Sequence, residues 1–382
     1  MNARTPTAPP IPLVDLAAQH DQVRDEVAAG WARVVETGAF IDGPDVQAFE
    51  TELAAFSGAA HAIGCASGTD ALEIALKAAG VEPGDGVIVP ANTFAATAEA
   101  VVRMGATVEF ADVDPDTMLL DADAAKAALT PRTRAIIPVH LYGQMAPVAG
   151  LRALAEAEGL VLVADAAQAQ GATAAGEGIA AGVAIAATSF YPGKNLGAYG
   201  DGGAVLCDDD EVARIARSIG HHGVESDRYV HVRPGFTSRL DTLQAVVLRA
   251  KLARLAGWNE QRRAAAARYH DLLAGRDDVR RPVCSAGNEH VWHLYPVRVA
   301  DRDQLLAGLQ GAGIGAGAHY PVPLHLQQAF ADPATGPGAF PVAERAAASV
   351  LSLPIFPGIT AAQQVRVVET LLDLLDRGGA GS

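Results

Sequence analysis

Short apolar runs alternate with segments of helical spacing between residues 60 and 220, and this alternation is the strongest constraint on the fold. The run at 61–65 precedes a segment in which Leu72, Leu76 and Ala79 recur on one helical face. Continuous apolar strands that alternate with amphipathic helices are typical of a parallel sheet covered on both faces. The pattern therefore predicts an α/β fold with a mainly parallel sheet, whose further strands are expected at 84–90, 107–113, 134–141, 160–167, 183–190 and 203–209.

The pattern changes after residue 236. A long, mostly helical stretch covers 238–275, and Gly257 is expected to break or kink it. The elements that follow are a strand at 291–299 and helices at 301–313 and 360–378. The predicted organisation is a disordered N-terminus at 1–10, a large domain at 11–257 and a smaller C-terminal α+β domain at 258–378.

Composition excludes several classes of protein. The 382 residues are 50% hydrophobic with a net charge of −15, so the chain can bury a large core but lacks the basic surface of a general nucleic-acid binder. The cysteines at 65, 207 and 284 lack CxxC spacing, which indicates a reducing compartment and no metal site. Without a signal peptide or an apolar run long enough for a membrane span, a cytoplasmic protein is expected.

Two strand ends carry candidate binding groups, and ligands of open α/β sheets bind beyond such ends. Gly68 and Thr69 follow the first strand, where Thr69 can cap the next helix and the first-turn N–H groups can bind a phosphate. Asp165 ends another strand, with Gln168 three residues on, and a buried acid needs a cationic partner such as a protonated ring nitrogen. An ordinary helix cap and a capping Asp at a turn are the alternative interpretations.

Only four of the 29 basic residues are lysines. Lys77, Lys126 and Lys251 fit solvated helix positions, where arginine would serve equally well. Lys194 lies in a turn rich in Pro and Gly after an apolar strand, and arginine cannot replace a lysine that forms an imine. A phosphate site, an acid for a pyridinium nitrogen and a Schiff-base lysine together match the needs of pyridoxal 5′-phosphate (PLP), with its amino form, PMP, arising in turnover.

Six segments resemble the DegT/DnrJ/EryC1/StrS family of sugar aminotransferases. They read GTDAL, NTFAATAEA, VHLYGQ, DAAQAQGA, SFYPGKNLGAYGDGGAV and SRLDTLQAVVLRAKL, and the resemblance runs from about residue 11 to about residue 327. It implies the aspartate-aminotransferase fold (PLP fold type I) and a homodimer with active sites at the subunit interface. Because family dehydratases carry a His at the position of Lys194, the lysine favours transamination over dehydration, and over a non-enzymatic PLP-binding regulator.

The resemblance also implies roles for individual residues. Lys194 is expected to form the Schiff base and Asp165 to contact the pyridine nitrogen. The other expected cofactor contacts are Gln168 and Phe94 at the ring and Gly68, Thr69 and Ser189 at the phosphate.

Two positions depart from the family pattern. Thr237 stands where the family often has an Asn that reaches the partner's cofactor phosphate, so a weaker or rearranged contact is expected. Gln170 stands where the family often has a His, which leaves any role of an imidazole there in doubt.

Family substrates are keto-sugars on a nucleotide diphosphate, with L-glutamate usually as the amine donor, and one subset acts on keto-inositols. The segments SRLDTLQA and HYPVPLH most resemble enzymes that aminate C3 of dTDP-3-keto-6-deoxyhexoses, often for antibiotics, with C4 amination as the alternative. Candidates for the diphosphate are Arg239, Arg233 and the pair His221–His222, and candidates for the sugar are His319, Tyr320 and His325. A structural hydrogen bond or ion pair is the alternative role for each.

Overall fold

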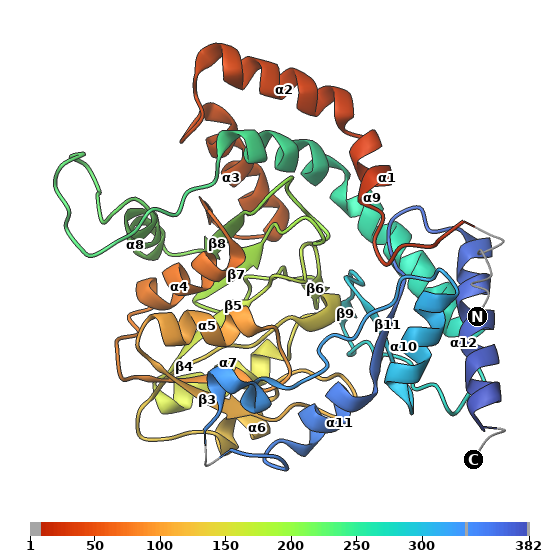
Figure 1. The fold of residues 1–382 in the computed structure, drawn as a ribbon. Helices are drawn as coiled ribbons and strands as arrows, with labels where there is room; N and C mark the ends of the chain where they lie inside the picture. The colour runs from red at the N-terminus through yellow and green to blue at the C-terminus, as the bar shows by residue number, and fades with distance from the viewer. Residues whose placement is uncertain (1–8, 333–334, 380–382) are drawn as a thin grey trace.

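A seven-stranded sheet forms the centre of the larger part of the chain (Figure 1). The computed structural model describes residues 9–332 and 335–379, so residues 1–8 of the predicted disordered N-terminus lie outside the described residues. The strand order is β1-β8-β7-β5-β4-β2-β3. The strands are β1 (His61–Cys65), β2 (Gly86–Pro90), β3 (Thr107–Ala111), β4 (Thr133–Ile136), β5 (Val161–Asp165), β7 (Ile185–Ser189) and β8 (Gly203–Cys207).

The sheet is mainly parallel, as predicted, and β8 is the exception. It pairs antiparallel with both β1 and β7, whereas the pairs among β7, β5, β4, β2 and β3 are parallel. The chain passes from β7 to β8 through the loop 190–202, with no crossover helix. Parallel neighbours require a long crossover, so this direct connection reverses the direction of β8.

Helices cover both faces of the sheet because successive strand residues point to opposite sides. In β1, Ile63 and Cys65 join the core under one set of helices, and Ala62 joins the core on the other side. The first set comprises α4 (Gly68–Ala78), α5 (Ala95–Arg103) and α8 (Asp210–Gly220). The opposite side carries α3 (Pro44–Ser57), α6 (Ala122–Ala127), α7 (Val148–Glu158) and the first half of α9 (Thr242–Leu272).

The C-terminal part has its own core around an antiparallel pair of short strands. Its elements are β10 (Tyr295–Arg298), β11 (Val350–Leu353), α10 (Arg302–Gly311), α11 (Pro341–Ser349) and α12 (Ala361–Gly379). The last turns of α9 enter this core through Ala265 and Tyr269, and Ile11 joins it from the N-terminal end. A small antiparallel pair of β6 (Thr173–Ala174) and β9 (Asn288–Glu289) links the two parts.

The long helix α9 continues through Gly257, so the expected break is not present. A single Gly destabilises a helix by only about 1 kcal/mol relative to Ala, and packing at both ends of the helix can offset this cost. The predicted domain boundary at 257 therefore falls inside a continuous helix, and the domain limits stay a prediction. No helix among the described residues is both long enough and apolar enough to cross a membrane.

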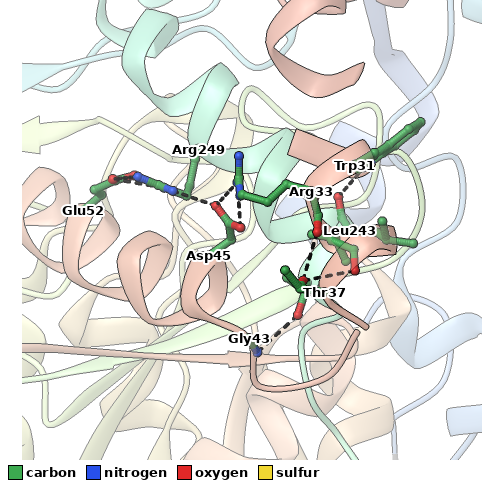
Figure 2. A network of polar contacts seen from close by, with 10 residues as sticks. Trp31, Arg33, Thr37, Gly43, Asp45, Glu52, Leu243 and Arg249 are labelled. Carbon is green, nitrogen blue, oxygen red and sulfur yellow. Dashed lines mark hydrogen bonds and ion pairs between the residues drawn. The ribbon is translucent and has the colours of Figure 1, made fainter. Parts of the chain in front are cut away.

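Helix α1 (Leu16–Asp21) precedes α2 (Arg24–Thr37), and both α2 and α3 pack against α9. Figure 2 shows the polar contacts among α2, α3 and α9. Asp45 is 5% exposed and accepts hydrogen bonds from Arg33 at 2.8 Å and Arg249 at 2.7 Å, and Arg249 also bonds Glu52 at 2.8 Å. Burial acts to raise the pKa of Asp45, but the two arginines outweigh it and hold the pKa below its ordinary value.

Replacing Asp45 with asparagine tests this network. Asp45→Asn should lower the free energy of unfolding at pH 7 by about 1–3 kcal/mol, because two arginines lose a buried charged acceptor. The pKa of Asp45 is lowered in the folded state, so this contribution is present at neutral pH and is lost as the pH falls through the folded pKa. Urea denaturation followed by circular dichroism, at pH 7 and at a pH below the folded pKa of Asp45, measures the difference in the free energy of unfolding between the two proteins.

Glu52→Gln is the matched control, because Glu52 bonds the same Arg249 but its side chain is 41% exposed. This exposed partner should contribute less than about 1 kcal/mol. Equal effects of the two substitutions would contradict the assignment of Asp45 as the centre of the network.

Candidate active site

The loop 190–202 carries Lys194 at the end of β7. Its first turn is closed by the Lys194 N–H, which donates to the Tyr191 carbonyl at 2.8 Å, and Ala198 N–H donates to the Phe190 carbonyl at 2.8 Å. Burial of the amine lowers the pKa of Lys194 to about 8, although the charge of Asp165 acts in the opposite direction. A substantial fraction of this amine is therefore neutral near physiological pH, as nucleophilic and proton-transfer chemistry require.

Asp165 ends β5, the parallel neighbour of β7, and is 6% exposed. Its carboxylate accepts hydrogen bonds from the Thr97 hydroxyl at 2.8 Å and the Ala167 N–H at 3.1 Å. Burial raises the pKa of Asp165, whereas these hydrogen bonds and the charge of Lys194 lower it in part. The structure thus brings the two central residues predicted from the sequence into one electrostatic pair.

The start of α4 lies against the end of β7. A Cβ atom added to Gly68 would lie 2.5 Å from the Cβ of Ser189, so only glycine permits this approach. Gln170 is buried and donates to the Ser189 carbonyl at 2.8 Å and the Thr188 hydroxyl at 2.9 Å, which fixes the end of β7. Gly68 N–H and the Ser189 hydroxyl therefore lie together, as a phosphate site needs.

The helix cap at this site is Ser67 rather than Thr69, so the expected capping role of Thr69 is wrong. The Ser67 hydroxyl oxygen accepts from the Asp70 N–H at 3.1 Å, and Ser67 has the extended backbone of an N-cap residue. Thr69 lies in the first turn of α4, partly buried, and its phosphate role stays a prediction. Placing the cap one or two residues off is an ordinary error when neighbouring Ser and Thr both fit the cap position.

Gln168 connects the large part of the chain with the segment 316–326. Its amide oxygen accepts from the Tyr142 N–H at 2.7 Å, and its amide nitrogen donates to the Tyr320 hydroxyl at 2.9 Å. The Tyr142 hydroxyl donates in turn to the carbonyl of His319, and the ring of Phe94 lies 5.6 Å from that of Tyr320. The structure therefore brings Phe94, Gln168, His319 and Tyr320 into one cluster.

Two imidazoles lie within the electrostatic influence of Lys194. Burial, with a smaller contribution from the charge of Lys194, lowers the pKa of His319 to about 4. The same two causes hold the pKa of His293 well below its ordinary value, and His293 bonds the side chain of Asn195 at 3.2 Å. Both rings are therefore neutral at physiological pH.

Sequence reasoning missed Thr97, Tyr142, Gln170 as an anchor of β7, and His293. Thr97 and Tyr142 lie in segments NTFAATAEA and VHLYGQ, whose likeness to the family was the one available signal. His293 follows no predicted strand end and had no such signal. Its proximity to Lys194 arises from packing between residues about a hundred positions apart.

Other candidates lie apart from this cluster. The ring of His325 is buried between Phe110 and Phe340 and bonds Glu344 at 3.1 Å. These contacts match the alternative, structural role of His325 rather than sugar binding. The Thr237 hydroxyl bonds His222 at 2.6 Å. An ion pair joins Arg233 to Glu225, and the ring of His221 contacts the carboxylate of Asp42 at 3.2 Å.

Thr237 and Arg239 line a hollow of about 390 Å³ with Asp201 and Gln244. The Nε atom of Arg239 is buried and has no hydrogen-bond partner within residues 9–332 and 335–379. Arg239 is therefore a predicted diphosphate contact with a buried guanidinium donor that no other described residue engages.

The prediction of a solvated position for Lys251 is wrong. Lys251 is 3% exposed, and its Nζ donates to the Gly197 carbonyl at 2.6 Å and lies 4.5 Å from the centre of the Tyr199 ring. Burial lowers the pKa of Lys251 to about 8. Lys126 is exposed as expected, and Lys77 is partly buried and bonds Glu73 at 2.7 Å.

Comparison with known proteins decides the family. The sequence matches the DegT/DnrJ/EryC1/StrS aminotransferase family over residues 21–372. The chain belongs to this family. A dTDP-3-amino-3,4,6-trideoxy-α-D-glucose transaminase from Streptomyces venezuelae is 45% identical over 99% of this chain and 99% of its own.

Two further proteins support the assignment. A UDP-N-acetyl-3-dehydro-α-D-glucosamine 3-aminotransferase from Acidithiobacillus ferrooxidans is 45% identical over 94% of this chain and 97% of its own. The crystal structure of S. venezuelae DesV in complex with a ketimine intermediate matches with a TM-score of 0.93 at 45% identity, covering 96% of this chain and 98% of that one. The predicted family and aspartate-aminotransferase fold are confirmed, and the chain is a PLP-dependent aminotransferase.

The described residues fit the cofactor. The close approach of Gly68 to Ser189 leaves backbone and hydroxyl donors for a phosphate, and Asp165 is a buried acid able to face a protonated ring nitrogen. Lys194 supplies an amine that is easily deprotonated. The individual contacts remain predictions, and the chemistry of the donor set agrees with them.

Replacing Gly68 with alanine tests the phosphate site. The added Cβ collides with the Cβ and Cα of Ser189, which cannot rotate away, so a loss of about 1–3 kcal/mol is expected. Displacement of Ser189 at the phosphate site should lower the affinity for PLP by about tenfold or more. Absorbance titration of the cofactor-free protein with PLP measures the change.

Gly150→Ala, on α7, is the matched control, because a Cβ there would lie at an ordinary distance of 3.6 Å from the Cβ of Ala122 on α6. It should leave PLP affinity unchanged. An unchanged affinity in Gly68→Ala as well would show that the phosphate binds elsewhere.

Proposed function

We propose that the chain transfers an amino group to C3 of a dTDP-linked 3-keto-6-deoxyhexose, with L-glutamate as the donor. The activity is the transamination of a nucleotide-linked keto-sugar in aminodeoxysugar biosynthesis. The observation that carries the assignment is the electrostatic interaction of the partly buried Lys194 with the buried carboxylate of Asp165, where the adjacent strands β7 and β5 end. C3 amination is favoured because the similar protein from S. venezuelae is named for a 3-amino sugar and the one from A. ferrooxidans is named as a 3-aminotransferase of a 3-dehydro sugar.

When bound, PLP supplies the electron sink that stabilises a carbanion next to the transferred nitrogen. Asp165 would hold a proton on the ring nitrogen, and the hydrogen bonds from Thr97 and Ala167 keep its carboxylate in position. Lys194, freed as a neutral amine, would move a proton between the substrate carbon and the cofactor carbon. His293 and His319, both neutral, leave Lys194 as the base with the pKa closest to the working pH.

The sugar nucleotide would lie between the cluster of His319 and Tyr320 and the hollow that contains Arg239. Arg239 has a donor available for a diphosphate oxygen, and a charged hydrogen bond of this type is stronger than a neutral one. Thr237, bonded to His222, would donate to a phosphate less directly than the Asn common in the family. A direct sugar contact of His325 stays a prediction, and it would have to compete with the hydrogen bond from its ring to Glu344.

We place the enzyme in the cytoplasm, in a pathway for an amino sugar such as those on antibiotics. Cys65, Cys207 and Cys284 are free, which suits a reducing compartment.

The functional test uses the protein in its PMP form. Incubation with 3-keto and 4-keto dTDP-6-deoxyhexoses should give amino sugar from the 3-keto compound, measured by mass spectrometry of the nucleotide product. Turnover of only the 4-keto compound would replace the proposed substrate by the alternative. Turnover of neither would remove the dTDP-hexose assignment.

Borohydride reduction of the PLP form controls for the role of Lys194. Peptide mapping should place the reduced cofactor on the peptide that contains Lys194. Label on any other lysine would contradict the proposed site, whatever the substrate.

We also propose a homodimer. The segment 223–236 between α8 and α9 projects from the body (Figure 1) and exposes Tyr229, Val230 and Val232 by 81%, 52% and 53%. Exposed apolar side chains gathered in one segment are typical of an interaction site. The segment leads directly into Thr237 and Arg239, so a second subunit bound there would lie next to the proposed substrate site.

Sedimentation velocity tests the dimer. The full chain should sediment as a dimer, and serine at Tyr229, Val230 and Val232 together should shift it toward monomer by removing buried apolar area. Val283→Ser, which changes an equally apolar side chain that is 43% exposed elsewhere, is the control. A monomeric wild-type chain at micromolar concentration would contradict the proposal.

A further inference from the structure

One face of α9 bonds the loop that carries Lys194 at three places. The contributing residues lie seven and eight positions apart, so each is about two helical turns from the next. Their side chains bond alternate residues of the loop. The three contacts are Gln244 to the Tyr199 N–H at 2.8 Å, Lys251 to the Gly197 carbonyl at 2.6 Å, and Asn259 to the Asn195 side chain at 2.9 Å.

Lys251, at the centre of this face, is the residue whose burial is hardest to explain by packing. No ion pair joins it to a carboxylate within residues 9–332 and 335–379, whereas Arg249 and Arg254 nearby bond Glu52 and Glu26. Burying an ammonium group without an anion is costly, and an apolar side chain of similar length would avoid that cost. The carbonyl of Gly197 and the ring of Tyr199 are the groups that its amine contacts.

The loop is folded tightly at the point that Lys251 holds. A Cβ atom on Gly197 would lie 2.3 Å from the carbonyl oxygen of Pro192, so the chain returns almost onto itself around Lys194. The Lys194 N–H closes the first turn of this fold on Tyr191. Restraining the carbonyl of Gly197 therefore restrains the turn that presents the amine of Lys194.

We propose that Lys251 is a positioning residue for Lys194: through the Gly197 carbonyl and the Tyr199 ring it holds the loop 190–202 so that the Lys194 amine stays desolvated beside Asp165. This inference rests on the proposed role of Lys194 as the cofactor-binding amine. Lys251 itself contacts neither the substrate nor the cofactor in this proposal. It acts on the chemistry only by limiting how water reaches Lys194.

The test measures the amine of Lys194 directly in the full-length chain from which bound PLP has been removed. Competitive acetylation with acetic anhydride across a pH series, followed by mass spectrometry of the Lys194 peptide, gives the midpoint at which this amine deprotonates. In the native chain the midpoint should lie near 8. In Lys251→Met it should rise by about one pH unit, because a loosened loop lets water stabilise the ammonium, so the neutral fraction at pH 8 falls about fivefold.

Three variants separate positioning from a general loss of structure. Lys251→Arg keeps N–H donors and a cation over the Tyr199 ring, and should return the midpoint toward the native value. Arg268→Met removes a basic side chain of α9 that bonds Gln364 at 3.0 Å, away from the loop, and should leave the midpoint unchanged. If Lys251→Met does not fold, Gln244→Met removes the partly buried contact to Tyr199 and should raise the midpoint in the same direction.

An unchanged midpoint in the folded Lys251→Met variant, or in Gln244→Met if that variant has to serve, would overturn the proposal. So would an equal shift in Arg268→Met, which would mark a change of the whole helix. A failure of the proposed function looks different, because borohydride would then label another lysine while the midpoint of Lys194 could still be measured.

Discussion

The buried pair of Lys194 and Asp165 is the interaction on which the chemistry of this chain depends. Each group alone would be driven toward its neutral form by burial, the amine through a lowered pKa and the acid through a raised one. Their mutual attraction opposes both shifts, so each residue favours the charged form of the other. This balance requires the ends of β5 and β7 to meet at one edge of the sheet, which the parallel pairing of these two strands provides.

Much of this pair could be predicted because its signals are local. An acid at the end of an apolar strand and a lysine in a Pro/Gly turn are both visible within ten residues of sequence. The strands of the sheet are visible in the same way, since their apolar runs are continuous. The direction of β8 was not visible, because periodicity is the same for either direction and only the missing crossover helix reverses it.

The surroundings of some residues could not be predicted because they come from distant segments. Lys251 lies on an amphipathic helix where a solvated end was the ordinary expectation, and the loop that covers it lies about fifty residues earlier. His325 is paired with Glu344, which follows it by 19 residues in a separate helix. Helical spacing tells which residues share a face, but it does not tell which segment packs against that face. It therefore could not show that Lys251 is buried or that His325 pairs with Glu344.

Helix α9 relates the two walls of the site to each other. Its stretch from Gln244 through Lys251 to Asn259 bonds the loop of Lys194, and its last turns enter the C-terminal core. Between them the buried guanidinium of Arg262 donates to the carbonyl groups of Trp292 at 3.1 Å and Ile355 at 2.9 Å. Because the helix is continuous through Gly257, a displacement of the C-terminal part relative to the sheet must bend α9 or break these contacts. The helix therefore links the position of Lys194 to the part of the chain that holds His319 and Tyr320, and this link follows from packing along one helix rather than from any single catalytic residue.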